Sequence, residues 1–454
     1  MTLDDFRALA ATGGPAAVAR HIAETLARIG GYNTTTQADA AQIADLLGSG
    51  GPGPLSGLPI GVKDNIDALP FATTGGSPAL QGHVPAADAP PVARLRDAGA
   101  VPVMKLNLHE FAFGVTSNNA LYGPVRNPVD PERVAGGSSG GNASAIALGL
   151  IPAALGTDTG GSVRIPAAFC GICGFRPSTG RYPDGGVLTI SATRDTIGPM
   201  AATVADCATL DGIVAGDETL PALPDRPLRL GIASDIRPGL SAQVDDAMTK
   251  ALDLLEAADI TLIHVDAADI DAATILHGDP VAFCEGRASF SRLARDLVGL
   301  SYDDVAAKVA SPDVAGIFAA LPMLAEQTRK AWQTAIATAL PRLKGDWSAL
   351  LDAAGVDAIL SATVPVPPPL IGEDETMAVE GADLPTFPTI VRNTTRASML
   401  GTPSLSLPAG RDSQGLPVGL MVEGRTGEDR RVLAIGLALE AVLAPCNTVQ
   451  ETRK

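Results

Sequence analysis

The chain has 454 residues, of which 46% are hydrophobic and only 4% aromatic, and its formal net charge at pH 7 is −17. This composition indicates a globular protein whose core is built from small and aliphatic side chains. The acidic balance, without a Lys/Arg cluster that could neutralise several phosphates, argues against direct nucleic-acid binding. The start of the chain lacks the pattern of a secretory signal and no apolar run spans a membrane, so we expect a cytoplasmic location.

Amphipathic helices are expected first along the chain. Val18, Ile22 and Leu26 share one stripe with Ile29, which predicts a helix over residues 16–29 that packs onto the body of the protein. A second helix is expected at about residues 37–47. The stretch GSGGPGPLSG then leads into the apolar run LPIGVKD, which predicts a strand.

A βαβ unit follows from the next two segments. APPVARLRDAGA has helical spacing and VPVMKLN is a second short apolar strand. Parallel strands with helices over their faces place a site near the carboxyl ends of the strands, where Lys63 and Lys105 stand. A Pro- and Asp-rich connector at 216–227 precedes a strand in LRLGIAS, a helix near 244–257, mostly helical residues 268–355, and a strand in VDAILSATVPVPPP that Pro365 ends.

The five cysteines are expected to be reduced thiols, because they are odd in number and spread over the chain: Cys170, Cys173, Cys207, Cys284 and Cys446. Cys170 and Cys173 have the spacing of a zinc knuckle, but no second cysteine pair or close histidine pair accompanies them. We therefore expect neither a metal site nor another cofactor.

Two glycine-rich stretches surround serines. GGSSGG spans residues 136–141, and GTDTGGSVR places two glycines before Ser162. Glycine lets backbone N–H groups approach a ligand closely, so the amides of Thr159, Gly160, Gly161 and Ser162 are expected to converge on a developing oxyanion. One such donor is worth about 3 kcal/mol of barrier. Two closely packed turns without a catalytic role remain the alternative.

Ser138 also fits the G-x-S-x-G pattern of a nucleophile elbow, together with Gly136 and Gly140. An elbow serine follows an apolar strand directly, whereas NPVDPERVA before this motif carries two prolines and three charges. Only His264 and His277 lie downstream to serve as a base, and neither stands in a recognisable site. A Ser-His-acid triad on Ser138 is therefore disfavoured.

A base other than histidine must be neutral near pH 7. Lysine meets this requirement when burial lowers its pKa. Lys63 in LPIGVKDNID is the candidate, because an otherwise apolar strand places its ammonium toward the interior or at the edge of the sheet. The alternative is a strand-end lysine whose ammonium reaches solvent.

GVKDN, GGSSGG and GTDTGGSVRIPAAFCGICGFRPS, in this order, closely resemble the amidase signature family of Ser-cisSer-Lys hydrolases. The resemblance is densest over residues 58–200. It implies an α/β fold with a large mixed, mostly parallel twisted sheet covered by helices on both faces. It also implies a single domain over 1–454, with N-terminal helices in 1–57, a catalytic core in 58–215 and a second subregion with pocket segments in 228–454.

The resemblance assigns roles to three side chains. It implies that Ser162 is the nucleophile that forms an acyl-enzyme, that Ser138 is a bridging serine on a cis peptide bond, and that Lys63 is the base. The Ser138 hydroxyl would take the proton of Ser162 and pass its own to neutral Lys63.

Three further residues are expected to support the site. By the same resemblance, Asp158 and Arg164 hold the nucleophile loop, with a plain surface ion pair as the alternative. Ser139 is expected to form a hydrogen bond near the lysine or to cap the helix NASAIALGL.

The local sequences HEFAFGVTSNN and FPTIVRNTTRASMLGTPSLSLPAG are most similar to bacterial indoleacetamide and mandelamide hydrolases. This similarity implies a small-molecule substrate, a primary amide of an arylacetic or similar acid, cleaved to the carboxylate and ammonia. The pocket is expected to involve Phe113, Thr116, Ser117, Asn118 and Asn393, although each also suits a core or turn position.

Other functions within the family stay open. The chain could be the glutaminase subunit of a tRNA-dependent amidotransferase complex, or an amidase for aliphatic, malonamide-like or urea-derived amides. An inactive homologue is disfavoured, because Lys63, Ser138 and Ser162 are all present. A homodimer is also left open.

Overall fold

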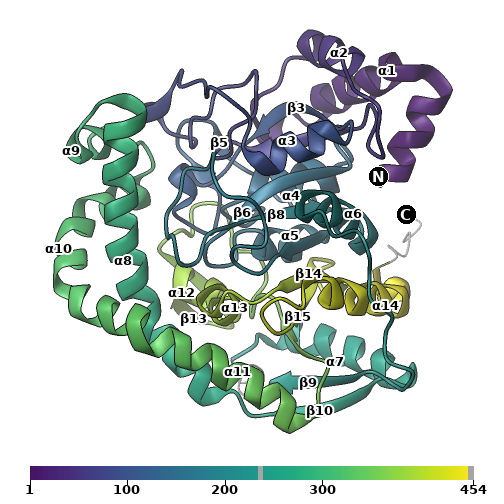
Figure 1. Ribbon diagram of the computed structural model, residues 1–454, viewed down its shortest axis with the longest axis vertical. Helices are drawn as coiled ribbons and strands as arrows, with labels where there is room; N and C mark the ends of the chain where they lie inside the picture. Colours follow the sequence, from purple (N-terminus) through teal and green to yellow (C-terminus); the bar gives the residue numbers. More distant parts are fainter. Residues whose placement is uncertain (234–238, 448–454) are drawn as a thin grey trace.

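A computed structural model describes residues 1–233 and 239–447, and these residues form an 11-stranded sheet that runs through the molecule (Figure 1). Two small hairpins, β4 (Asn118–Asn119) with β5 (Gly123–Pro124) and β12 (Thr376–Val379) with β13 (Ala382–Pro385), lie outside the sheet. The strands of the sheet, in the order in which they pair, are β1 (Thr35–Gln37), β3 (Val101–Leu106), β2 (Pro59–Lys63), β6 (Ala153–Asp158), β8 (Thr196–Ala201), β7 (Cys173–Arg176), β14 (Ser404–Arg411), β15 (Pro417–Glu423), β11 (Ala358–Ala362), β9 (Arg229–Ala233) and β10 (Thr261–Val265).

The pairing of the strands is mixed. β3, β2 and β6 are parallel to one another, as are β11, β9 and β10, and antiparallel pairs through β8, β7, β14 and β15 join these two blocks. The predicted βαβ unit is confirmed, because β2 and β3 pair in parallel on either side of a helix in sequence. The sheet takes strands from both the 58–215 and the 228–454 segments.

The helices account for most of the remaining secondary structure. Short 3-10 segments lie at η1 (Gly30–Tyr32), η2 (Pro78–Leu80) and η3 (Glu110–Ala112), and a π-helical turn, η4 (Ala335–Ala339), joins two long helices. The α-helices are α1 (Leu3–Arg28), α2 (Ala40–Gly48), α3 (Pro90–Asp97), α4 (Gly140–Ala147), α5 (Arg164–Cys170), α6 (Val204–Ala215), α7 (Ala242–Ala257), α8 (Ala268–Val298), α9 (Tyr302–Ala306), α10 (Pro312–Thr334), α11 (Leu340–Ala354), α12 (Thr386–Val391), α13 (Thr395–Leu400) and α14 (Asp429–Asn447).

Two predictions near the N-terminus need correction. The helix expected over 16–29 belongs to α1, which begins at Leu3 and bends at Gly14, where φ is +63°. The helix expected at 37–47 begins only at Ala40, because residues Thr35–Gln37 pair as an edge strand with β3, and Asp39 then caps the helix by accepting from the Ala41 N–H.

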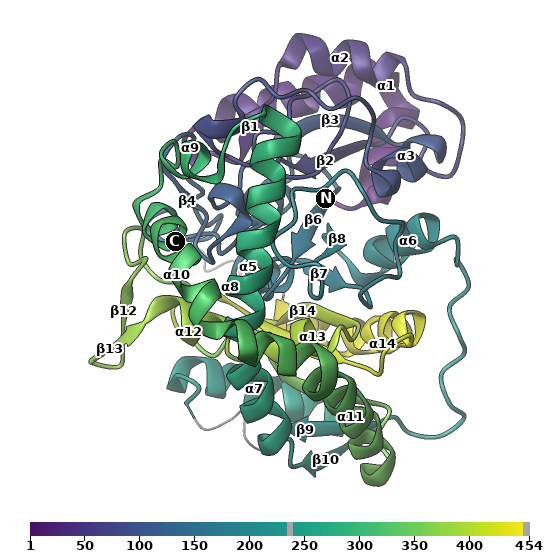
Figure 2. The same cartoon turned by 60° about the vertical axis from the view of Figure 1, so that its left-hand side comes forward.

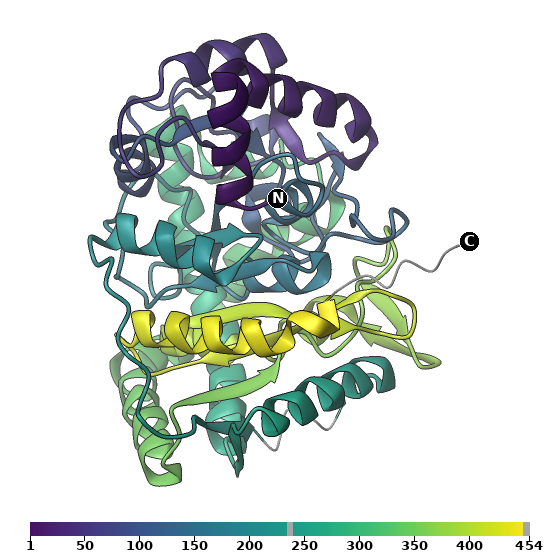
Figure 3. The same cartoon turned by 90° about the vertical axis from the view of Figure 1, so that its right-hand side faces the viewer.

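Helices cover both faces of the sheet, which confirms the predicted layers (Figure 3). Leu405 of β14 packs against Gly436 of α14 on one face. The next residue, Ser406, points to the other face, where Ala168 of α5 packs onto Gly419 of β15. This alternation follows from the two-residue period of a strand, and it places α5 and the loop before it on one defined side.

Helices α8, α9 and α10 extend beside the sheet (Figure 2). Phe290 of α8 and Phe318 of α10 contact Phe111, which follows β3, so an apolar cluster joins this helical region to the core. Among the described residues, none of the helices has both the length and the apolar character required to cross a membrane.

Candidate active site

Lys63 ends β2, a strand whose residues are all buried, and its side chain is fully enclosed. Its Nζ lies 2.8 Å from the Ser138 Oγ and 2.8 Å from the Thr157 Oγ1. Burial lowers the pKa of Lys63 to about 7, against the opposing effects of Asp158 and Asp195. The alternative prediction, that the Lys63 ammonium reaches solvent, is therefore wrong. This side chain can be neutral near pH 7.

Ser138 lies in the turn before α4, and the Gly137–Ser138 peptide bond is cis. Its side chain is buried, and its carbonyl accepts a hydrogen bond from the His109 N–H at 3.2 Å. Within the described chain, a loop rather than a strand leads into Ser138. The nucleophile-elbow alternative therefore does not fit this segment.

Ser162 stands in the loop between β6 and α5, with its residue surface 6% exposed. Its carbonyl accepts the Ser139 N–H at 3.1 Å, which ties the two glycine-rich turns together. The Ser162 Oγ forms no hydrogen bond with another described residue. The structure thus joins Lys63 to Ser138 directly and Ser162 to them through the backbone, and catalytic hydrogen bonds often form fully only with substrate bound.

The backbone of the 159–162 loop is held in a conformation that needs glycine at Gly161, where φ is +126° and an added Cβ would lie 2.4 Å from the Thr394 Oγ1. The Thr394 hydroxyl donates to the Gly160 carbonyl at 2.6 Å. The Gly161 N–H donates to Asp158 Oδ1 at 2.9 Å, so it is not free as the predicted oxyanion donor. Thr159, Gly160 and Ser162 are left as the predicted donors.

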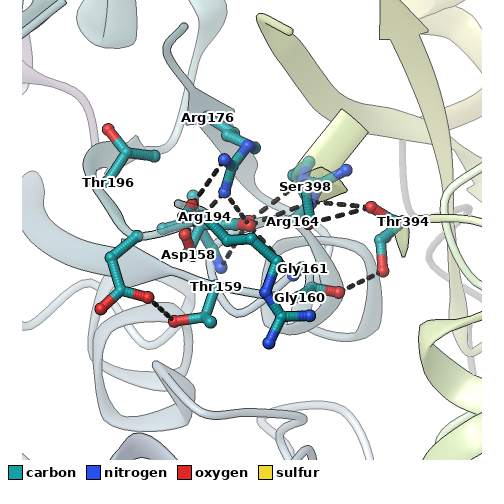
Figure 4. Close-up of polar contacts among 12 residues, drawn as sticks. Asp158, Thr159, Gly160, Gly161, Arg164, Arg176, Arg194, Thr196, Thr394 and Ser398 are labelled. Carbon is teal, nitrogen blue, oxygen red and sulfur yellow. Dashed lines mark hydrogen bonds and ion pairs between the residues drawn. The ribbon is translucent and has the colours of Figure 1, made fainter. Parts of the chain in front are cut away.

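Asp158 is the centre of a buried charge network (Figure 4). Its carboxylate pairs with Arg164 at 3.0 Å and with Arg176 at 2.8 Å, and all three side chains are fully enclosed, so the surface ion pair considered for Asp158 and Arg164 is wrong. Burial alone would raise the pKa of Asp158, but the two guanidiniums hold it well below its usual range. Arg164 also donates to the Thr394 carbonyl at 3.1 Å and to the Ser398 Oγ at 2.8 Å. The network therefore locks the start of α13 onto the nucleophile loop.

Ser139 is the residue before α4, but its side chain makes no capping bond there. Its Oγ donates instead to the carbonyl of Thr157 at 3.3 Å, next to the hydroxyl that contacts Lys63. Of the two expected positions for Ser139, the one near the lysine is confirmed and the capping one is wrong.

The predicted pocket residues are spread over different surroundings. Phe113 packs edge-on against Phe290 with ring centres 5.8 Å apart, and Ser117 accepts the Gly140 N–H at 3.1 Å beside the Ser138 turn. The Asn393 amide donates to the Ala362 carbonyl at 2.8 Å, and its oxygen accepts from the Arg392 Nε at 3.1 Å.

Thr116 and Asn118 share one partner. The Thr116 hydroxyl donates to Asp374 at 2.6 Å and the Asn118 amide donates to its other oxygen at 2.5 Å. These contacts attach the segment after β3 to the loop before β12 and occupy both polar side chains.

Several residues of the site were not predicted. Thr157 directly precedes Asp158, Asn65 lies two residues after Lys63, and the Asn65 amide donates to the Thr157 Oγ1 at 3.0 Å. The Thr159 hydroxyl donates to Asp195 at 2.6 Å, and burial raises the pKa of Asp195. The motifs GVKDN, GTDTGG and GFRPS contained Asn65, Thr157 and Arg176, whereas nothing local pointed to Asp195 or Thr394 as parts of the site.

Comparisons with known proteins agree with one another. The family model described as Amidase matches residues 16–433. An indoleacetamide hydrolase of Agrobacterium vitis is 38% identical over 407 residues, covering 89% of this chain and 87% of the relative, and a mandelamide hydrolase of Pseudomonas putida is 39% identical over 418 residues, covering 88% and 80%. A glutamyl-tRNA(Gln) amidotransferase subunit of Thermus thermophilus is 35% identical over 415 residues, covering 86% of each. A crystal structure of an amidase superposes with a TM-score of 0.83 at 35% identity, covering 98% of this chain and 100% of that one.

Proposed function

Because the chain belongs to the amidase family and is an amide-hydrolysing enzyme, we propose that it cleaves small carboxylic amides through an acyl intermediate on Ser162. The observation that carries the proposal is the enclosed 2.8 Å contact between Lys63 Nζ and Ser138 Oγ, in a lysine whose pKa burial lowers to about 7. The Ser139 N–H, which bonds the Ser162 carbonyl, brings the nucleophile loop against this pair.

The reaction proceeds in two halves. The Ser162 Oγ attacks the amide carbonyl carbon, while its proton passes to Ser138 and the Ser138 proton passes to neutral Lys63. The oxyanion is stabilised by the backbone N–H groups of Thr159, Gly160 and Ser162. The C–N bond then breaks as the proton returns from Lys63 through Ser138 to the leaving nitrogen. Water attacks the acyl ester with the same relay as base, and the carboxylic acid leaves with Ser162 restored.

The proposed substrates are primary amides of arylacetic-type acids, which release ammonia. The support comes from relatives named indoleacetamide hydrolase and mandelamide hydrolase, at 38% and 39% identity. Phe113 is proposed to line the aryl pocket, because it borders the aromatic cluster with Phe290 and is only partly buried. A cytoplasmic location and a homodimer stay predictions.

A second candidate is the glutaminase subunit of an amidotransferase, supported by the glutamyl-tRNA(Gln) amidotransferase relative at 35% identity. The two candidates differ in what the purified chain does alone. A stand-alone amidase releases ammonia from phenylacetamide without a partner, whereas the glutaminase of a complex requires its partner proteins for hydrolysis of glutamine.

The experiment measures ammonia release by the purified chain from aryl, alkyl and dicarboxylic amides and from glutamine. Covalent labelling with a fluorophosphonate identifies the nucleophile, and Ser162→Ala is expected to abolish it. Thr395→Ala, which removes an ordinary hydroxyl that donates to the Val391 carbonyl, serves as the control and keeps labelling. Labelling that persists in Ser162→Ala would overturn the assignment.

A further inference from the structure

Arg194 is a buried arginine whose donors are mostly unused. The residue is 8% exposed, and its side chain contacts the Ser191 Oγ through Nε at 3.3 Å and the Met399 Sδ through Nη1 at 3.8 Å. A guanidinium carries five N–H donors in a planar fork. Other buried arginines differ: Arg164 pairs with Asp158, and Arg396 pairs with Asp271 and Glu423. Within the described residues, Arg194 forms no such ion pair.

The nearby carboxylates are committed to other donors. Asp195 accepts from the Thr159 hydroxyl and from the backbone N–H groups of Ile190 and Ser191. Glu285 of α8 accepts from the Ser191 hydroxyl at 2.5 Å and from the Thr193 N–H at 3.0 Å. Burial lowers the pKa of Arg194, opposed by Asp195, Glu285 and Asp279. These acids therefore balance the charge of Arg194 from a distance without using its N–H groups.

Arg194 belongs to the wall of the candidate site. Its carbonyl accepts from Arg176 at 2.6 Å, and the same guanidinium binds Asp158. In Figure 4 the Arg194 side chain extends toward the Thr159–Gly161 stretch. That stretch borders open space, since no described heavy atom lies within 4 Å of a Cβ built on Gly160. The unused donors thus lie beside the loop that carries Ser162.

We propose that Arg194 binds an oxygen acceptor on the acyl group of the substrate, close to the scissile carbonyl. The substrate class is then amides whose acyl part bears a hydroxyl, carbonyl or carboxylate oxygen near the reacting carbon. A charged donor left unpaired in a buried site favours the ligand that supplies its acceptor. The planar fork suits two oxygens at once, which a lysine at this position would not reproduce. This inference rests on the proposed amidase function.

The test compares kcat/KM for three amides that differ at one position: phenylacetamide, 2-hydroxy-2-phenylacetamide and the monoamide of phenylmalonic acid. The wild-type chain is expected to prefer at least one oxygenated amide over phenylacetamide. Arg194→Met removes the donors and is expected to reduce that preference roughly ten- to hundred-fold, as for hydrogen bonds to a charged group. Comparing kcat/KM for the amide that bears a hydroxyl with kcat/KM for the amide that bears a carboxylate distinguishes a neutral acceptor from an anionic one.

Arg292→Met is the matched control, because it removes the same charge from a position on α8 outside the candidate site and is expected to leave the preference unchanged. Arg194→Gln, which keeps two donors, provides a second variant if the methionine variant folds poorly. A wild-type chain with equal kcat/KM for all three amides would overturn the inference, and so would an Arg194 variant that lowers all three equally. A wild-type chain that hydrolyses no amide would instead refute the proposed function.

Discussion

The lowered pKa of Lys63 predicts how activity changes with pH. The base must be neutral, and with a pKa of about 7 it is neutral in half of the molecules at pH 7. The neutral fraction falls from about nine-tenths at pH 8 to about one-tenth at pH 6, and at still lower pH it falls roughly tenfold per pH unit. The value of kcat/KM is therefore expected to rise roughly tenfold between pH 6 and pH 8 and then to level off.

Asp195 offers a way to move this transition. Its carboxylate is one of the two that raise the pKa of Lys63, so Asp195→Asn is expected to lower that pKa and shift the acid limb to lower pH. The amide oxygen of asparagine can still accept from the Thr159 hydroxyl. Asp253→Asn, an exposed substitution on α7, is the control and leaves the limb in place.

The assay is the initial rate of ammonia release from phenylacetamide, measured from pH 5.5 to pH 9.5 at subsaturating substrate, with full recovery of activity checked after return to pH 8. A rise of kcat/KM with its midpoint near the ordinary lysine pKa would refute a neutral Lys63 as the base. A kcat/KM that stays constant between pH 6 and pH 8 would refute it as well. An Asp195→Asn limb that moves to higher pH would refute the electrostatic explanation of its position.

Four substitutions, of which Gly160→Ala is a control, test the nucleophile loop. Thr394→Val removes the hydroxyl that donates to the Gly160 carbonyl, and is expected to lower kcat/KM about fivefold, the value of one net hydrogen bond; an unchanged value in steady-state kinetics would contradict this role. Gly161→Ala is expected to lower the midpoint of thermal unfolding, because its Cβ would lie 2.4 Å from the Thr394 Oγ1, whereas Gly160→Ala meets open space and should unfold as the wild type does. Asp158→Asn leaves two buried guanidiniums without their carboxylate and is expected to cost about 3–5 kcal/mol in the free energy of unfolding, measured by denaturant titration. Because the folded pKa of Asp158 is depressed, its stabilisation is complete above the ordinary aspartate pKa and is lost as pH falls toward the folded value, so the difference between wild type and Asp158→Asn should shrink in acid.

The parts of the site that could be predicted from sequence are those encoded by local patterns. The apolar strand that ends at Lys63 and the glycines around Ser138 and Ser162 made these residues candidates, and the resemblance of the three motifs to the amidase signature family supplied their predicted roles. Thr394 could not be found this way. Its contact with Gly160 spans 234 residues and depends on how the sheet brings the two segments together.

Tertiary pairing also explains where local patterns failed. Residue 37 was expected to begin a helix, but the open edge of β3 takes Thr35–Gln37 as a strand. Thr116 and Asn118 stay predicted pocket residues, but their local sequence did not indicate that Asp374 binds both from a loop more than 250 residues away. A sequence pattern shows that a side chain is polar, but it does not show which residue forms the hydrogen bond with it.

The contacts of Thr394 and Ser398 with the nucleophile loop have a consequence for the biosynthesis of the enzyme. The ribosome makes the loop long before it makes α13, so a growing chain contains Lys63, Ser138 and Ser162 without the residues that hold Gly160 and Arg164 in place. Hydrolytic competence is therefore expected to emerge late in synthesis, when the C-terminal strands β14 and β15 join the sheet. A chain truncated before residue 394 should hold its nucleophile in a loose loop.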